Sequence, residues 1–196
     1  MTGLIQDGHF QRYGMILYLL RHGETDWNTE MRLQGREDVP LNEKGLRQAK
    51  EATAMFEGVK LDYILSSPLS RAVVTAGYIS DYTGVPVIIE PDLTERFFGA
   101  LSGANYRDID VFKLTNEYKG LEPINEVSDR MVGVFDKYPL DSTVLAVSHG
   151  GAINSVLKLA DRENKGPGRE KLKNACLSCL DYDGKSFKVI FYNKTV

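Results

Sequence analysis

The sequence predicts an α/β fold, a sandwich built on a mainly parallel sheet that is closed by one antiparallel hairpin. Three observations carry this prediction. Short apolar runs alternate with segments of helical periodicity along most of the 196 residues. Two of the runs end at a histidine followed by glycine, as expected where a buried strand reaches a polar loop. The last two runs flank Asp183-Gly184, a typical hairpin turn.

Six apolar runs are the candidate strands. They lie at residues 16–20, 63–65, 85–90, 144–147, 176–182 and 187–192. Pro86 makes the third strand short or places it at an edge of the sheet, because proline cannot donate a ladder hydrogen bond. The turn between the last two strands is predicted to be of type I′, at Asp183-Gly184.

The segments between the runs carry the helix signals. Asn42 is placed to cap a helix whose sheet-facing positions begin at Leu46 and recur at spacings of three and four. Ser67 and Pro68 suit the N-cap and the first position of a second helix, which ends before Gly84. Further helices are predicted over residues 105–118, 124–138 and after residue 151, with loops over 91–103 and 162–170.

Length and composition indicate one folded domain. We place it at residues 15–196 and treat residues 1–14 as an extension outside the core. A net charge of −3 provides no positive field to attract nucleic acid or anionic lipid, and no apolar stretch is long enough to span a membrane. The first residues lack the basic and apolar segments of a signal peptide, so a cytoplasmic location is expected.

The two cysteines are predicted to be packing residues. Cys176 and Cys179 lie three apart in a predicted strand, which directs them to opposite faces. The alternative, a redox or metal-binding pair, is weaker because a single C-x-x-C lacks the second pair of ligands that a structural zinc site needs.

Two of the three histidines lie at the ends of the two strongest strands. His22 follows the first strand and His149 the fourth, and in a parallel sheet both emerge at the same edge. The glycines after them allow close approach of a ligand, and Gly150 opens a helix whose N-terminal N–H groups can bind phosphate. Arg21 and Arg71 add guanidinium groups suited to phosphate oxygens. The sequence therefore predicts a local anion site in an acidic chain.

These residue types suit phosphoryl transfer. A histidine between guanidinium groups is disfavoured as the imidazolium, so its neutral ring can attack phosphorus. The arginines and the second histidine can stabilise the phosphoryl group with no metal or other cofactor. Glu95, after the third strand, is the carboxylate best placed by chain order to protonate the leaving oxygen. Each residue also has a structural alternative: a hydrogen-bonded loop histidine, a surface Arg71, or a Glu95 that pairs with a neighbouring arginine.

The combination and its order resemble the histidine phosphatase superfamily, which includes the phosphoglycerate mutases. The matching segments are residues 20–28, 33–35, 40–45, 66–72, 93–95, 98–99 and 147–151. The resemblance implies a three-layer sandwich whose six-stranded, mostly parallel sheet has one antiparallel strand. It implies that His22 is the nucleophile and Glu95 the proton donor. The phosphate pocket would then consist of Arg21, Arg71, His149 and Asn28, with Gln34 and Gly35 on the substrate side.

The predicted function is metal-independent hydrolysis of a small phosphorylated metabolite through a phosphohistidine. Only 54 positions separate Glu95 from His149 (149 − 95), so a short lid leaves water access to the phosphohistidine. A phosphoglycerate mutase with the same site is the alternative, and a noncatalytic phosphate-binding module a third interpretation. The substrate and the oligomeric state stay open. Arg36, Arg96, Arg107 and Lys113 are candidates either for a second anion-binding group or for solvated surface charges.

Overall fold

The computed structural model describes residues 14–107, 109, 114, 118–161 and 166–196, and within them six strands form one sheet. The strands are β1 (Met15–Arg21), β2 (Tyr63–Ser66), β3 (Val87–Ile89), β4 (Thr143–Ser148), β5 (Leu177–Tyr182) and β6 (Phe187–Lys194). Their order across the sheet is β3-β2-β4-β1-β5-β6. Among them β5 alone runs in the direction opposite to the other five, so the predicted mixed sheet with a short edge strand β3 is confirmed.

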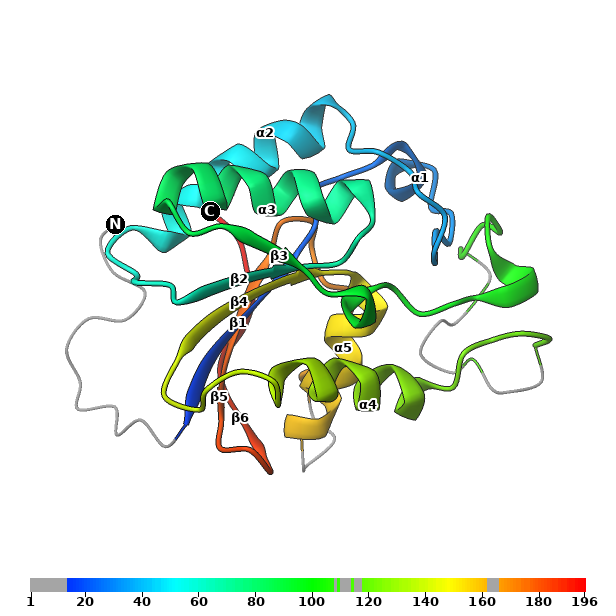
Figure 1. Cartoon of the computed structure of the whole chain (residues 1–196). Coiled ribbons are helices and arrows are strands. Elements are labelled where there is room, and N and C mark those ends of the chain that lie inside the picture. Colours follow the sequence, from blue (N-terminus) through cyan, green and yellow to red (C-terminus); the bar gives the residue numbers. More distant parts are fainter. Residues whose placement is uncertain (1–13, 108, 110–113, 115–117, 162–165) are drawn as a thin grey trace.

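Helices cover both faces of the sheet, which confirms the three-layer prediction (Figure 1). One face carries α2 (Glu43–Glu51) and α3 (Ser70–Thr83), and the other carries α4 (Ile124–Phe135) and α5 (Gly150–Ala160). The connections contain α1 (Asp26–Thr29) and the 3₁₀ turns η1 (Ala52–Phe56), η2 (Pro91–Leu93) and η3 (Gly99–Leu101). In the described part of the chain, no helix has the length and apolarity needed to cross a bilayer.

Successive side chains of β1 point to opposite faces of the sheet and pack in two separate hydrophobic cores. Leu17 belongs to the core beneath α4 and α5, and Leu20 to the core beneath α3 and η1. The two cysteines are free and buried, Cys176 in the first core and Cys179 in the second. Their predicted role as packing residues on opposite faces is therefore confirmed.

Asn42 caps α2 as predicted, but the packed face of that helix differs from the expectation. The Asn42 side chain accepts the Gly45 N–H at 2.8 Å. Gly45 lies so close to the backbone of Glu24 that a Cβ on it would meet the Glu24 carbonyl oxygen at 2.0 Å. Because the contact face is centred on Gly45, its neighbour Leu46 turns away from the sheet and is 38% exposed.

The start of α3 also differs from the prediction. The helix begins at Ser70 instead of Pro68, because Leu69 has an extended backbone with ψ 135°. Ser67 still accepts an N–H, from Leu69 at 3.3 Å, but its hydroxyl also contacts the ring of His149. The C-terminus of α3 is as predicted, with Gly84 in the left-handed conformation at φ 75°.

The helix predicted over residues 105–118 falls largely outside the described residues. Its described members, residues 105–107, 109, 114 and 118, are not helical. The helix predicted over 124–138 is present as α4 and ends at Phe135. Residues 1–13 of the predicted extension and residues 162–165 of the predicted loop also lie outside the described residues.

The hairpin of β5 and β6 is confirmed, whereas its predicted type I′ turn at Asp183-Gly184 is wrong. The chain reverses at Gly184 and Lys185, between the Asp183 N–H and the Ser186 carbonyl (3.3 Å). Of these two central residues, only Gly184 has a positive φ (86°), whereas a type I′ turn needs two. The Asp183 carboxylate accepts the N–H groups of Lys185 and Ser186, which places it before the reversal.

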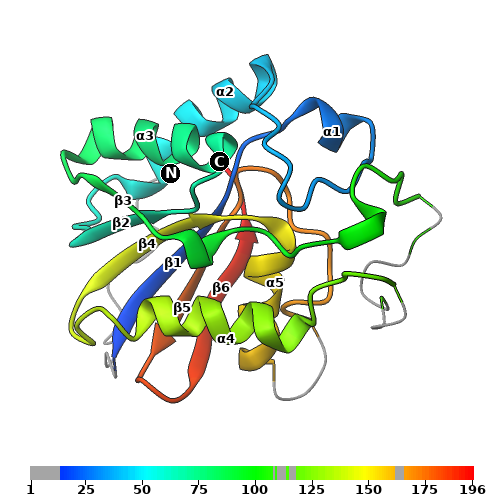
Figure 2. The same ribbon diagram turned by 45° about the vertical axis from the view of Figure 1, so that its right-hand side comes forward.

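The loops after β1 to β4 gather at one end of the sheet (Figure 2). The register pairs Arg21 with Ser148, so the histidines that follow leave neighbouring parallel strands side by side. Two loops far apart in the sequence meet here: Leu33 N–H donates to the Ala104 carbonyl at 2.9 Å, and Gly103 N–H to the Leu33 carbonyl at 2.7 Å. This end of the fold therefore positions the candidate site.

Candidate active site

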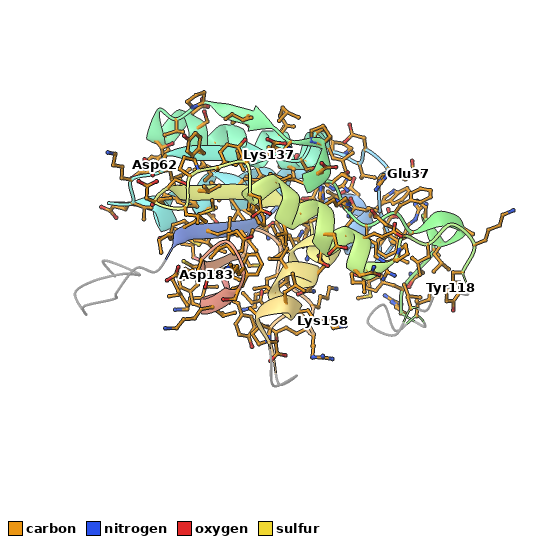
Figure 3. All side chains as sticks on the ribbon, turned by 60° about the horizontal axis from the view of Figure 1, so that its bottom comes forward. Glu37, Asp62, Tyr118, Lys137, Lys158 and Asp183 are labelled. Atoms are coloured by element: carbon orange, nitrogen blue, oxygen red, sulfur yellow. The ribbon has the colours of Figure 1, made fainter. Side chains whose placement is uncertain are left out.

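The carboxyl ends of β1 and β4 open into a pocket of about 390 Å³, at the end of the molecule that Glu37 and Tyr118 mark in Figure 3. The structure brings together on its wall the predicted residues Arg21, His22, Asn28, Gln34, Gly35, Arg71, Glu95 and Gly150. His149 lies directly behind them, with its ring centroid 5.2 Å from that of His22. The predicted residues on this wall run from Arg21 to Gly150, which are 129 positions apart in the chain (150 − 21).

The ring of His22 is held in one tautomer. Its Nδ1 lies 2.6 Å from the carbonyl oxygen of Gly23, which can only accept a hydrogen bond, so Nδ1 carries the proton of the neutral ring. Burial, and then the charges of Arg71 and Arg21, hold the pKa of His22 well below its usual value. The resting form at neutral pH is therefore a neutral imidazole with its lone pair on Nε2.

His149 has a protein partner on each ring nitrogen. Arg71 Nε donates to its Nδ1 at 3.2 Å, and its Nε2 lies 2.8 Å from the Ser67 hydroxyl. Because Nδ1 accepts, the proton of the neutral ring is on Nε2 and points to Ser67. Burial, and then Arg71, hold the pKa of His149 well below its usual value. His149 is thus placed against Arg71, one layer behind the pocket wall, and its predicted contact with phosphate stays a prediction.

Arg71 is fixed by three hydrogen bonds. Besides His149, it donates through Nη1 to the Glu37 carbonyl at 2.6 Å and through Nη2 to the Gly35 carbonyl at 2.9 Å. Its side chain is buried in this frame, and burial lowers its pKa to about 10. One N–H on each terminal nitrogen is left over from these bonds, so the fork can present two donors to an anion.

One nitrogen of the Arg21 guanidinium donates a hydrogen bond within the protein, and another has no acceptor among the described residues. Its Nη1 donates to the Leu172 carbonyl at 2.5 Å. Its Nε is buried and has no hydrogen-bond partner among the described residues. A buried N–H without an acceptor costs free energy unless a ligand supplies one, so this nitrogen is suited to an anionic oxygen. Gly150 leaves room beside it, since a Cβ there would lie 3.4 Å from Arg21 Nε.

Glu95 is bound at the N-terminus of α5. Its Oε1 accepts the N–H groups of Arg96 and Ala152, both at 2.8 Å, and its Oε2 accepts the Gly151 N–H at 3.0 Å. A side chain at position 151 would collide with it, because a Cβ there would meet Glu95 Oε1 at 2.7 Å. The predicted structural alternative, a pair with a neighbouring arginine, is not what holds this carboxylate: three backbone N–H groups do.

The remaining predicted residues line the pocket and differ in which of their hydrogen-bonding groups already have a partner in the protein. Asn28 Oδ1 accepts from Asn174 Nδ2 at 2.9 Å and from Thr25 N at 3.2 Å, so Nδ2 is its remaining donor. The oxygen of the buried Gln34 side chain has no partner among the described residues. Gly35 has φ 53° and uses its carbonyl to hold Arg71.

The glycine after His22 has a different role from the one expected. A Cβ on Gly23 would meet the carbonyl oxygen of Gly45 in α2 at 2.4 Å. Gly23 therefore allows two backbone segments to pack, and its N–H donates to the Thr75 hydroxyl at 3.2 Å. Close approach of a ligand is not what this position requires.

Of the four cations considered for a second anionic group, one lines the pocket. Arg96 is on the wall, with Nε bonded to the Glu122 carbonyl at 2.7 Å. Arg36 instead pairs with the Glu122 carboxylate, and Arg107 contacts Met31 outside the pocket wall. Lys113 lies outside the described residues.

Sequence reasoning missed Arg130 and Glu122. Arg130 Nε and Nη2 donate to the two oxygens of the Glu122 carboxylate at 2.9 and 3.2 Å, and the same guanidinium binds the backbone around Glu95. Glu122 precedes α4 and Arg130 lies in its second turn, eight positions later (130 − 122). Their positions on either side of the predicted start of this helix were the one available signal for the contact.

Two buried neutral histidines make stability depend on pH. Since the pKa values of His22 and His149 are lowered in the fold, the unfolded chain binds more protons than the native state below about pH 6.5. Unfolding free energy is then lost as the pH falls. From pH 7.5 to 5.5 we expect a loss on the order of 1 kcal/mol for each of the two groups.

Urea unfolding in phosphate-free buffer at both pH values measures this loss. His149→Gln, which keeps an acceptor for Arg71, should remove about half of it. An unfolding free energy that does not change over this interval, or a pH dependence that is the same in His149→Gln, would contradict the assignment of neutral rings.

The chain is similar to one known protein family and to individual proteins of known sequence. A model described as the histidine phosphatase superfamily (branch 1) matches residues 17–195. A protein named uncharacterized phosphatase PhoE from Bacillus subtilis is 35% identical over 179 residues, which cover 89% of this chain and 92% of that protein. A probable phosphoglycerate mutase GpmB from Cronobacter sakazakii is 34% identical over 189 residues, covering 85% and 84% of the two chains.

Solved structures share the fold. Phosphoserine phosphatase from Entamoeba histolytica, in complex with 3-phosphoglyceric acid, has a TM-score of 0.76 and 26% identity, with 92% of this chain and 98% of that chain covered. A mycobacterial glucosyl-3-phosphoglycerate phosphatase in complex with VO3 has a TM-score of 0.77 and 27% identity, covering 92% and 99%.

Proposed function

The chain belongs to the histidine phosphatase superfamily and is an enzyme of that family, and on this premise we propose that it hydrolyses a small phosphate monoester through a phosphohistidine at His22. The observation that carries the proposal is the tautomer of His22. Its Nδ1–H is bound to the Gly23 carbonyl, so the lone pair of Nε2 is available to a phosphorus atom in the pocket.

In the first step, the Nε2 lone pair attacks phosphorus and the bond from phosphorus to the ester oxygen breaks. The ring gains positive charge as the new bond forms, and the Gly23 carbonyl at Nδ1–H stabilises that charge. The in-line geometry puts the leaving oxygen on the side of the phosphorus opposite His22.

Arg21 and Arg71 neutralise the phosphoryl oxygens. The buried Nε of Arg21 and the two free N–H groups of Arg71 are donors already fixed in place by the protein. His149 acts on Arg71 in this arrangement, and rotation of its ring away from Ser67 would add a further donor to the phosphate. Asn28 Nδ2 and the Gly150 N–H at the start of α5 complete the predicted pocket.

Glu95 donates the proton that the leaving oxygen needs. Its Oε2 accepts one backbone N–H where Oε1 accepts two, so Oε2 has a lone pair to carry that proton. In the second step Glu95 accepts a proton from water, whose oxygen attacks phosphorus as the bond to Nε2 breaks, which returns neutral His22 and inorganic phosphate.

The substrate that we propose is a small cytosolic metabolite, handled by one catalytic domain at residues 15–196. A pocket of about 390 Å³ suits a small molecule, and the two free cysteines agree with a reducing compartment. The solved neighbours named as phosphatases of phosphoserine and of glucosyl-3-phosphoglycerate support a phosphorylated small molecule in this site.

Phosphate release with p-nitrophenyl phosphate in the presence of EDTA tests the proposal. We expect turnover that the chelator does not reduce, together with a phosphoenzyme that is labile to acid and stable to alkali. Loss of turnover in EDTA that Mg²⁺ restores would contradict metal independence. No turnover over a broad panel of esters, despite tight binding, would instead favour a noncatalytic phosphate-binding module.

Phosphoglycerate mutase is the second candidate, which the GpmB relatives favour. Incubation with 3-phosphoglycerate and a bisphosphoglycerate primer separates the two activities. A phosphatase releases inorganic phosphate, whereas a mutase isomerises the substrate and releases none. We expect release, because the short connection between Glu95 and His149 leaves water access to the phosphohistidine.

A further inference from the structure

We propose that Arg130 is a positioning residue for Glu95, which it holds through the backbone on which that glutamate is carried. The inference rests on the proposed role of Glu95 as the proton donor. It adds the residue that fixes the position and direction of the Glu95 side chain. Arg130 lies on α4, one of the helices that cover the sheet, and is not on the pocket wall. Its hydrogen bonds therefore reach the reaction through the segment that it binds, while its charge also contributes to the lowered pKa of His149.

The guanidinium of Arg130 binds three backbone carbonyls in the loop after β3. Its Nη1 donates to the carbonyls of Asp92 at 2.5 Å and Thr94 at 2.7 Å, and its Nη2 donates to the carbonyl of Glu95 at 3.2 Å. The carbonyl between them, that of Leu93, accepts the hydroxyl of Ser148 at 2.7 Å. Four consecutive carbonyls are thus bound by side chains from α4 and from the end of β4.

This segment needs such donors because it has left the sheet. β3 ends at Ile89, and the loop that follows contains only the 3₁₀ turn η2 before Glu95. Its carbonyls therefore lack the partners that a helix or strand would supply, and the side chains of Arg130 and Ser148 provide donors instead. Leu93 is fully buried and anchors the loop in the core, while Arg130 and Ser148 fix its peptide planes. The direction in which Glu95 leaves the backbone follows from those planes.

Glu122 fixes the guanidinium in turn. It binds Arg130 with both carboxylate oxygens, and its Oε2 also accepts the Phe97 N–H at 2.8 Å. The two side chains are only 14% and 11% exposed, so the pair is shielded from water and salt. The bidentate contact sets the plane of the Arg130 guanidinium. It therefore also sets the directions in which the guanidinium N–H groups donate to the loop carbonyls. Hydrogen bonds thus join Glu122, Arg130 and residues 92–95 into one unit, which ends at Glu95, and the Glu95 carboxylate is bound in turn at the start of α5.

Dependence on the leaving group separates this role from a general structural one. Phenyl phosphate releases a phenol with a pKa of about 10, as for tyrosine, and needs the proton from Glu95. The p-nitrophenyl ester has the same ring but a better leaving group, which needs that proton much less. The measured quantity is kcat/KM, because it reports the steps up to departure of the leaving group.

Arg130→Met should lower kcat/KM for phenyl phosphate by about 50-fold and for p-nitrophenyl phosphate by less than about fivefold, as expected when a proton donor is misplaced by about 1 Å. Arg130→Lys is a second variant that keeps the charge beside Glu122 but not the planar fork, and we expect the same pattern at about tenfold. Asp129→Asn, at the exposed neighbouring position of α4, is the matched control and should leave both values unchanged.

Equal losses on both esters in folded Arg130→Met and Arg130→Lys would overturn the proposal, as would no loss in either. If Arg130→Met does not fold, Arg130→Lys alone decides. Glu95→Gln is the reference: if it shows no selectivity between the esters, the role of Glu95 fails and not merely that of Arg130. If the wild-type enzyme hydrolyses neither ester, the proposed function itself has failed.

Discussion

Replacement of His22 by asparagine is expected to lower kcat/KM for both phenyl and p-nitrophenyl phosphate by at least about 10⁴-fold. The reason is that asparagine cannot replace Nε2 as the nucleophile that attacks phosphorus. The structure gives this residue one proton, on Nδ1, and one lone pair, on Nε2. Asparagine can keep a hydrogen bond to the Gly23 carbonyl but has no nucleophilic nitrogen. The loss should therefore not depend on the leaving group.

Trapping of the phosphoenzyme gives an independent measurement of the same step. After rapid mixing with labelled substrate and quenching in alkali, we expect label on the wild type and none on His22→Asn. His9→Asn is the matched control, since His9 is the third histidine of the chain and has no predicted role. Label that persists in His22→Asn would assign the phosphohistidine to another residue.

Replacement of Glu95 by glutamine is expected to lower kcat/KM for phenyl phosphate by about 10³-fold and for p-nitrophenyl phosphate by less than about tenfold. Glutamine keeps an oxygen for the N–H groups of Arg96 and Ala152 but cannot donate an acidic proton. The ester whose leaving group requires protonation therefore suffers most.

The second half of the reaction should also slow in this variant. Without a carboxylate to accept the proton of the attacking water, hydrolysis of the phosphohistidine becomes slower than its formation from p-nitrophenyl phosphate. We expect a burst of p-nitrophenol close to one equivalent, followed by slow turnover and a phosphoenzyme that accumulates. Equal losses on both esters with no burst would exclude Glu95 as the acid and base.

The fold follows from local patterns to a large extent. Apolar runs located all six strands, and the histidines that end two of them predicted which edge of the sheet carries the site. The cap at Asn42 and the stop at Gly84 depend on one or two residues, so both were predictable. The expected packed face of α2 was wrong because a distant segment decides it. Leu46 turns outward because Gly45 packs against Glu24, twenty-one positions earlier (45 − 24).

The motifs also predicted which residues meet in the pocket, since eight of the nine predicted positions lie on its wall. The motifs did not predict the contacts that the residues around the pocket make with other segments. Ser67 was expected to cap α3 at its first turn, and in the structure its hydroxyl also binds His149, eighty-two positions away (149 − 67). Gly23 was expected to admit a ligand, whereas it admits the backbone of α2.

The sequence by itself thus determined the α/β class, the ends of the strands and the set of polar residues at one edge of the sheet. These properties depend on periodicity and on neighbours within a few positions, which the order of residues contains directly. Only the tertiary structure decided that His22 is protonated on Nδ1, that His149 faces Arg71, and that Arg130 grips the loop of Glu95. Those contacts depend on distances of a few ångströms between segments that packing brings together, and no local pattern specifies such distances.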